Sequence, residues 1–200
     1  MKKFALLILM SLPFFAQAGV INTLPSGISH AFSNINSFTS GPVSENGFTW
    51  TSTHNSSVYG YSNYYGLGNN GTWNNGLVFV GLNTANGDMT FTFDNPVSSV
   101  LAFLNYATPS YGSGMMSIYA ADNTLLESVV LNINTPSNAL NDGEYWGFSR
   151  ASAEIKSFTL SDAYIVAADL KTETIPEPAT LALMGLGLAG LGWSRKRKHR

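Results

Sequence analysis

The feature that most constrains the fold of this chain is a series of short apolar runs separated by residues that favour turns. The run Met89-Thr90-Phe91-Thr92-Phe93 alternates most cleanly and places its three large apolar side chains on one face, as in a half-buried β-strand. No helix-length apolar pattern lies between the runs, which argues against a parallel α/β fold. The sequence therefore predicts an all-β fold, an antiparallel two-sheet β-sandwich with a jelly-roll-like topology.

The expected strands cover residues 48–51, 77–80, 89–93, 100–106, 115–120, 125–132, 145–150, 155–160 and 164–170. Asn86-Gly87 is a strong turn dipeptide, so residues 77–83 and 89–93 are expected to form a hairpin. Residues 19–43 are polar and rich in Ser and Asn, with apolar residues spaced by three at Phe32, Ile35 and Phe38. They predict one short helix or a loose lead-in to a sandwich domain over residues 44–172.

Charge is segregated along the chain. The formal net charge is −2, yet residues 19–175 carry eleven acidic side chains against three basic ones. An acidic surface repels phosphate backbones, so nucleic acid is not an expected partner. The chain has no cysteine, which excludes disulfides, thiol catalysis, thiolate metal sites and acylation of a cysteine after a leader.

The N-terminal residues have the pattern of a secretory signal peptide. Lys2 and Lys3 precede an apolar run over residues 4–15, and Ala16-Gln17-Ala18 supplies small residues before a cleavage point. Residues 1–18 are therefore expected to be removed by signal peptidase after Ala18. The alternative is an uncleaved N-terminal anchor.

The C-terminal residues form a three-part tail. Residues 173–178 are a linker that contains Pro176-Glu177-Pro178, residues 179–194 are apolar and rich in glycine, and residues 195–200 are basic. As a transmembrane helix, the apolar stretch 179–193 would rise about 22 Å at 1.5 Å per residue, short of the ~30 Å hydrocarbon core. The basic cluster would remain cytoplasmic, which places the preceding chain on the far side of that membrane.

This order of Pro-Glu-Pro, Gly-rich apolar stretch and basic terminus resembles the PEP-CTERM sorting signal of exported proteins in Gram-negative bacteria that make exopolysaccharide. Pro176, Glu177 and Pro178 match its motif residue by residue. The resemblance implies recognition by a membrane-embedded exosortase, removal of the tail and transfer to the cell envelope, outer surface or extracellular matrix. A plain C-terminal membrane anchor is the alternative.

The middle of the chain also resembles the sandwich domains common in PEP-CTERM proteins, through the segment 93–97 and the closing Ala167-Ala168-Asp169-Leu170. Many relatives have paired acids before the last leucine, where this chain has Ala168. Calcium is the metal that carboxylates, amides and carbonyls from loops would bind. Glu45 and Asp169 would form such a site if the first and last strands adjoin; otherwise Asp169 simply ends the last strand.

No catalytic constellation is expected. A Gly-x-Ser-x-Gly elbow is absent, and the acidic residues fall mostly in turns, so the chain is expected not to be an enzyme and to have no cofactor other than calcium. Residues 58–73 combine aromatic rings with Asn and Gly, and Tyr61, Tyr64, Tyr65 and Trp73 are the candidate glycan platform. The alternative is that these rings cover the open end of the sandwich.

The sequence thus predicts a non-enzymatic exported β-sandwich that is held in the inner membrane as a precursor and then sorted by its tail. An exopolysaccharide is its candidate ligand. Two other functions remain open: a polysaccharide-modifying hydrolase, which needs clustered carboxylates in a groove, and a purely structural surface protein.

Overall fold

The computed structural model describes residues 19–174, and these residues form strands and no helix. The strands are β1 (Gly19–Ile21), β2 (Ile28–His30), β3 (Ser37–Phe38), β4 (Val43–Glu45), β5 (Phe48–Ser52), β6 (Val58–Tyr61), β7 (Tyr65–Gly66), β8 (Thr72–Trp73), β9 (Phe79–Gly81), β10 (Asp88–Val97), β11 (Ser99–Asn105), β12 (Met115–Tyr119), β13 (Leu125–Val130), β14 (Glu144–Ser149), β15 (Ile155–Ser161) and β16 (Val166–Glu173). All of the expected strands are present, with their ends shifted by a few residues.

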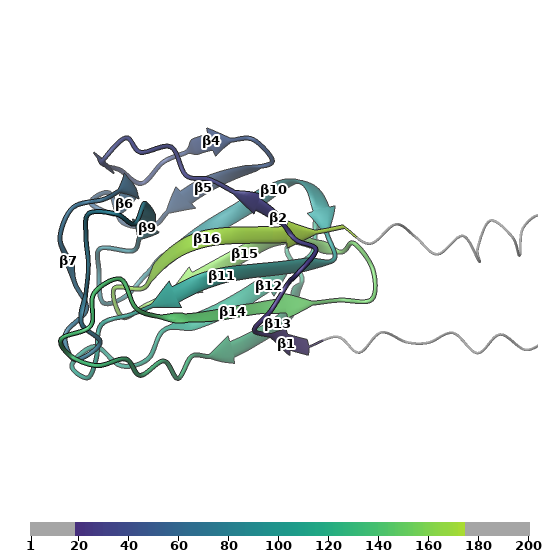
Figure 1. Cartoon of the computed structure of the whole chain (residues 1–200). Helices are drawn as coiled ribbons and strands as arrows, with labels where there is room; N and C mark the ends of the chain where they lie inside the picture. The colour runs from purple at the N-terminus through teal and green to yellow at the C-terminus, as the bar shows by residue number, and fades with distance from the viewer. Residues whose placement is uncertain (1–18, 175–200) are drawn as a thin grey trace, which may run out of the picture.

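Two antiparallel sheets pack against each other (Figure 1). The eight-stranded sheet has the order β1-β14-β11-β16-β9-β6-β3, with β2 added beside β16, and the six-stranded sheet has the order β13-β12-β15-β10-β5-β4. The short strands β7 and β8 pair with each other. This arrangement confirms the antiparallel two-sheet β-sandwich.

The core lies between the two sheets and is rich in aromatic rings. Met89, Phe91 and Phe93 of β10 are all buried, as their alternation predicts. The ring of Phe91 lies 5.6 Å from that of Phe48 on the neighbouring β5 and 6.2 Å from that of Phe158 on β15. Burying one such side chain contributes about 1.5–3 kcal/mol, so this layer stabilises a domain that has no cysteine.

The expected hairpin between residues 77–83 and 89–93 is wrong. β9 lies in the eight-stranded sheet, whereas β10 lies in the six-stranded sheet. Asn86-Gly87 makes the turn between the sheets, but it bonds to another loop: Gly87 N–H donates to Asp162 Oδ1, and Asp162 N–H donates to the Gly87 carbonyl. The turn forms where the sequence predicts it, but the strand that follows pairs with β5 and β15 instead of β9.

Residues 19–43 are part of the sandwich. β1 pairs with β14 and β3 with β6 at the two ends of the eight-stranded sheet, and β2 pairs with residues 170–172 of the interior strand β16. Phe32, between β2 and β3, is buried with its ring 5.9 Å from that of Phe91. No helix forms here because existing strands satisfy the backbone groups of this segment.

Both ends of the described chain lie at the same end of the sandwich. Gly19, Ser149, Ser99 and Glu173 are successive partners in one row across β1, β14, β11 and β16. The expected signal peptide with its cleavage point at Ala18, the Pro176-Glu177-Pro178 motif, the membrane helix over 179–194 and the basic tail lie outside the described residues. Residues 19–174 contain no helix able to cross a membrane.

Candidate functional site: a tyrosine-lined pocket

The aromatic segment 58–73 divides into a buried part and an open part. Val58, Tyr65, Leu67, Trp73 and Phe79 form a small second core on the outer side of the eight-stranded sheet. Trp73 is fully buried; it stacks on Phe103 with ring centroids 5.6 Å apart and donates from Nε1 to the Asp142 carbonyl at 2.7 Å. Trp73 therefore packs the domain and does not line the pocket described below.

The asparagines of this segment also have a packing role. The buried side chain of Asn70 donates to Asn105 Oδ1 at 3.0 Å and to the carbonyls of Tyr106 and Ile133 at 3.1 Å each. Its own oxygen accepts the Thr135 N–H at 3.3 Å. Asn105 in turn donates to the Asn70 carbonyl. This network, with Asn70, Asn105 and Thr135 as members, ties the Gly-rich loop to β11.

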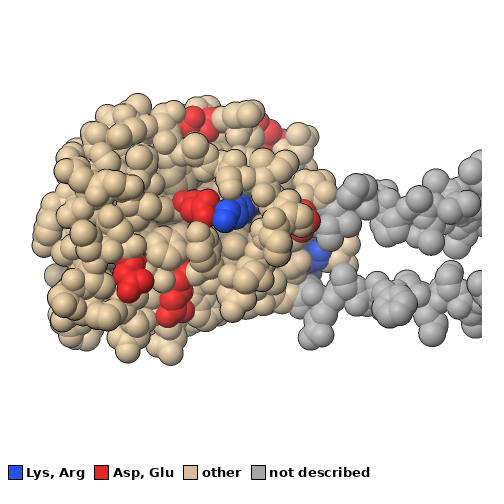
Figure 2. Space-filling model, in the orientation of Figure 1, with Lys and Arg blue, Asp and Glu red and all other residues tan. Residues whose placement is uncertain are grey.

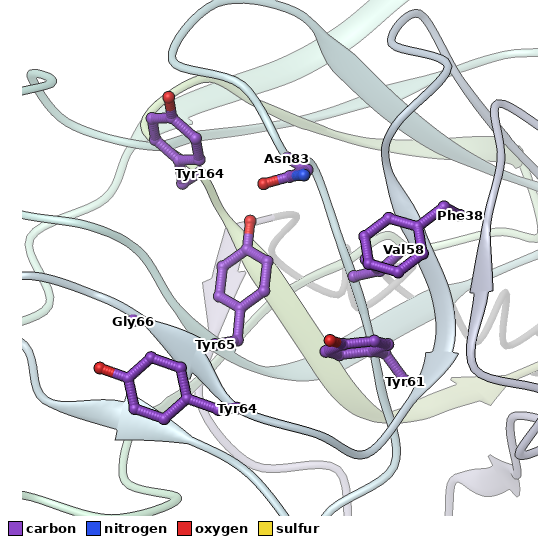
Figure 3. A pocket seen from close by; sticks show the side chains of 8 residues that line it. All are labelled: Phe38, Val58, Tyr61, Tyr64, Tyr65, Gly66, Asn83 and Tyr164. Carbon is purple, nitrogen blue, oxygen red and sulfur yellow. The ribbon is translucent and has the colours of Figure 1, made fainter.

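The open part forms a pocket of about 320 Å³, shown in Figure 3. We call it the tyrosine pocket. Its lining consists of Phe38, Val58, Tyr61, Tyr64, Tyr65, Gly66, Asn83 and Tyr164. Three of the four candidate glycan residues are thus brought together, whereas Phe38, Asn83 and Tyr164 come from distant segments that the sequence reading did not connect with them.

The tyrosines of the pocket differ in exposure. Tyr64 is 69% exposed, so its ring is open to a ligand. Tyr61 is half-buried and packs edge-on against Phe38, with ring centroids 5.5 Å apart. Tyr65 is buried and its hydroxyl donates to the Leu82 carbonyl at 3.2 Å. Burial, together with the nearby Tyr164, raises the pKa of the Tyr65 hydroxyl well above its usual range, so this group stays neutral.

A strained turn presents Tyr164. Asp162, Ala163 and Tyr164 are three consecutive residues with positive φ, at 67°, 50° and 54°. Each costs of order 1 kcal/mol or more, so the surrounding contacts must hold the turn. The N–H groups of these residues donate to the carbonyls of Gly87, Ala85 and Thr84, in that order. Strain of this kind concentrates at ligand-binding positions.

The two candidate calcium ligands have different partners. Glu45 accepts from the Ser33 backbone and hydroxyl and from the Tyr59 hydroxyl. Burial raises the pKa of the Glu45 carboxyl, but these hydrogen bonds outweigh it and leave that pKa lowered. Asp169 accepts instead from the Tyr145 hydroxyl at 2.6 Å and from Lys171 Nζ at 2.8 Å.

The electrostatics of Asp169 follow from those contacts. Burial raises the pKa of the Asp169 carboxyl, but the hydrogen bonds from Lys171 and Tyr145 and the charge of Lys171 lower it overall. The hydrogen bond to Asp169 also raises the pKa of Tyr145 to about 12. Residues 19–174 contain no group of three or more His, Cys, Asp or Glu placed to hold a metal ion. The calcium site stays a prediction.

A comparison with protein families finds a match in the C-terminal tail. Residues 174–197 match the family model described as "PEP-CTERM protein-sorting motif". This chain carries a PEP-CTERM sorting signal. A PEP-CTERM protein is exported and held transiently in the membrane before an exosortase processes it, so the expected sorting route is confirmed at that level. A comparison with curated proteins gives no match in sequence.

Solved structures share parts of the strand arrangement of this PEP-CTERM protein. They include a Streptococcus pneumoniae fucose binding module, SpX-3 (7% identity, TM-score 0.34, 49% of this chain and 73% of that one). The lectin domain of lectinolysin complexed with Lewis B antigen has 8% identity and a TM-score of 0.34, and the match covers 49% of this chain and 72% of that one. CsCBM6-3 from Clostridium stercorarium in complex with cellobiose has 13% identity and a TM-score of 0.32, and the match covers 64% of this chain and 95% of that one. Likenesses this weak carry no argument about the ligand of this chain.

Proposed function

We propose that this PEP-CTERM protein is a non-enzymatic component of the cell surface or extracellular matrix that binds polysaccharide through the tyrosine pocket. The observation that carries the proposal is the convergence of Tyr61, Tyr64 and Tyr65 from the segment 58–73 with Tyr164 from a distant turn on one open pocket (Figure 3). Concave sites lined by aromatic rings with a few polar groups are the usual form of a ligand site.

The chemistry of the lining suits a sugar. The face of an aromatic ring carries partial negative charge, and the C–H bonds on one side of a pyranose carry partial positive charge, so the two stack. Tyrosine hydroxyls and the Asn83 amide both donate and accept hydrogen bonds, as sugar hydroxyls do. Tyr65 already donates to Leu82, which leaves its oxygen free to accept a bond from a ligand.

Two of the described carboxylates, those of Glu45 and Asp169, lack the features of catalytic acids in a glycosidase. A glycosidase requires two carboxyl groups across one bond, one of them with a raised pKa. The pKa values of the Glu45 and Asp169 carboxyls are instead lowered, and both groups are occupied by hydrogen bonds within the fold. Neither lines the tyrosine pocket. These contacts support the proposal that the chain is not an enzyme.

Binding is tested by affinity electrophoresis through gels that contain soluble polysaccharides. Loss of an exposed aromatic hot spot costs more than about 1 kcal/mol, so Tyr64→Ala is expected to weaken binding about tenfold, which corresponds to 1.4 kcal/mol. Tyr119→Ala is the matched control, because Tyr119 is a half-buried tyrosine on β12 in the six-stranded sheet. Equal retardation of Tyr64→Ala and the unaltered chain in every gel would refute the site.

Sorting is tested separately, through the mass of the mature protein recovered from cells. We propose that signal peptidase cuts after Ala18 and that the exosortase then removes the tail at the Pro-Glu-Pro region. Replacing Pro176 and Glu177 together is expected to leave full-length protein in the membrane. Unchanged processing of that variant would contradict recognition through these residues.

A further inference from the structure

The lining of the tyrosine pocket contains no charged side chain. Its polar groups are tyrosine hydroxyls and the amide of Asn83. Burial holds the pKa of the Tyr65 hydroxyl high, so this group adds no charge in any physiological medium. A ligand in this pocket therefore meets ring faces and neutral hydrogen-bonding groups.

No Lys or Arg side chain of the described domain lines the tyrosine pocket, so none is placed to compensate for an anionic ligand there. The three basic residues of the domain all contact oxygens elsewhere. Arg150 pairs with Glu154 at 2.6 Å and Glu127 at 3.6 Å, Lys171 pairs with Asp169 at 2.8 Å, and Lys156 donates to the Asp94 carbonyl at 3.1 Å.

Acidic side chains outnumber these bases over the same part of the chain, eleven to three across residues 19–175. On the face shown in Figure 2, charged groups are few, and the surface over β6 and β7 is uncharged. An approaching anion is therefore repelled at long range and finds no partner at short range.

We propose, on the basis of the proposed function, that the tyrosine pocket takes a neutral sugar segment and rejects uronate-bearing or otherwise anionic ones. A carboxylate that enters the pocket loses hydration and gains no cation, and an unpaired charge is costly to desolvate. A neutral sugar of the same shape loses only hydroxyl hydration, which the tyrosines and Asn83 replace. Among mixed polysaccharides, the protein would select the neutral ones.

The experiment compares polymers that share a sugar backbone and carry either a neutral or an anionic substituent. The full chain, solubilised in a non-ionic detergent, is run through gels that contain one member of a matched pair. The pairs are hydroxyethylcellulose against carboxymethylcellulose, methyl-esterified against free polygalacturonate, and carboxyl-reduced against native alginate. Running each gel at about 0.15 M and 1 M salt separates long-range repulsion, which the higher salt screens, from desolvation inside the pocket, which it does not.

We expect every retained pair to favour the neutral member at least tenfold, with a preference that shrinks but persists at high salt. Retention of an anionic member as strong as that of its neutral partner overturns the inference and leaves the proposed function standing. Retention of no member of any pair overturns the proposed function, and the inference with it. The two failures are therefore distinguishable.

A variant with a cation in the pocket provides the reverse test. Asn83→Lys is expected to reduce the preference for the neutral member about tenfold. Asn95→Lys makes the same change in net charge at an exposed position on β10 and is expected to leave the preference unaltered. Equal effects of the two variants, at unchanged thermal midpoints, would mean that net charge and not the pocket sets the selectivity, which overturns the inference.

Discussion

Replacing Asn70 by alanine tests whether the buried amide network holds the Gly-rich loop in place. The substitution removes three donor contacts and one acceptor contact and leaves the Ile133 carbonyl and the Thr135 N–H buried without this partner. The two Nδ2 hydrogens are shared among the three acceptors, so at about 1 kcal/mol for each hydrogen bond the free energy of unfolding should fall by about 3 kcal/mol. Domains of this size have roughly 5–15 kcal/mol in total, so the loss is a large fraction.

The assay is equilibrium urea unfolding followed by tryptophan fluorescence, with midpoints compared at an unchanged slope. A thermal scan should show a fall of roughly 9 °C, at about 3 °C for each kcal/mol. Asn69→Ala is the control: Asn69 is the exposed neighbour in the same loop, and its loss should change stability by less than about 0.5 kcal/mol. A loss below about 1 kcal/mol for Asn70→Ala would refute the reasoning.

Three further substitutions test other parts of the fold. Trp73→Ala should lower the free energy of unfolding by about 3–5 kcal/mol. Trp73→Phe keeps the stack on Phe103 and should lower it by about 1 kcal/mol. If thermal unfolding ranked the two variants in the reverse order, the packing role of Trp73 would be contradicted. Gly68→Ala should cost more than about 2 kcal/mol, because Gly68 has a φ of +61° and an added Cβ would clash with the Thr108 carbonyl, so a variant as stable as the parent would contradict this account. The lowered pKa of the Asp169 carboxyl stabilises the fold above its unfolded pKa of about 3.9, and this stabilisation is lost as the pH falls through the lower, folded pKa. Asp169→Asn should therefore flatten the acid limb of a pH–stability profile, and an unchanged limb would count against it.

The strands could be predicted because their signal is local. The alternation in residues 89–93 reflects one buried and one exposed face, a property that a single strand carries in its own residues. The turn between β12 and β13 is local as well: Asn123 N–H donates to the Ala120 carbonyl, where Asp122-Asn123 predicts a short turn. Features of this kind need no knowledge of the partner strand.

The assignment of strands to sheets could not be predicted, because it depends on contacts between distant residues. Asn86-Gly87 is a turn in both the expected and the observed fold, but β10 pairs with β5 and with β15, from far along the chain, in the other sheet. Residues 19–43 looked like a lead-in because their apolar residues are sparse. They pair with strand edges whose positions are set elsewhere.

The candidate site was partly predictable for the same reason. Tyr61, Tyr64 and Tyr65 stand close in sequence and were found by composition. Trp73 looked equivalent, but Phe103 covers its ring from a separate strand. Tyr164 lies in an expected strand, and its left-handed backbone, held by the chain around Thr84, presents it to the pocket instead.

The row Gly19, Ser149, Ser99 and Glu173 has a geometric consequence for how the protein is displayed. β16 begins just after Tyr164 at the pocket and ends at Glu173 in that row, so the pocket lies roughly 25–30 Å from the row along the strand direction, at about 3.3 Å per residue. A sandwich tethered through either terminus therefore presents its pocket at the end farthest from the tether. Coupling the chain to a bead or a bilayer through its ends leaves the tyrosine pocket accessible to a ligand.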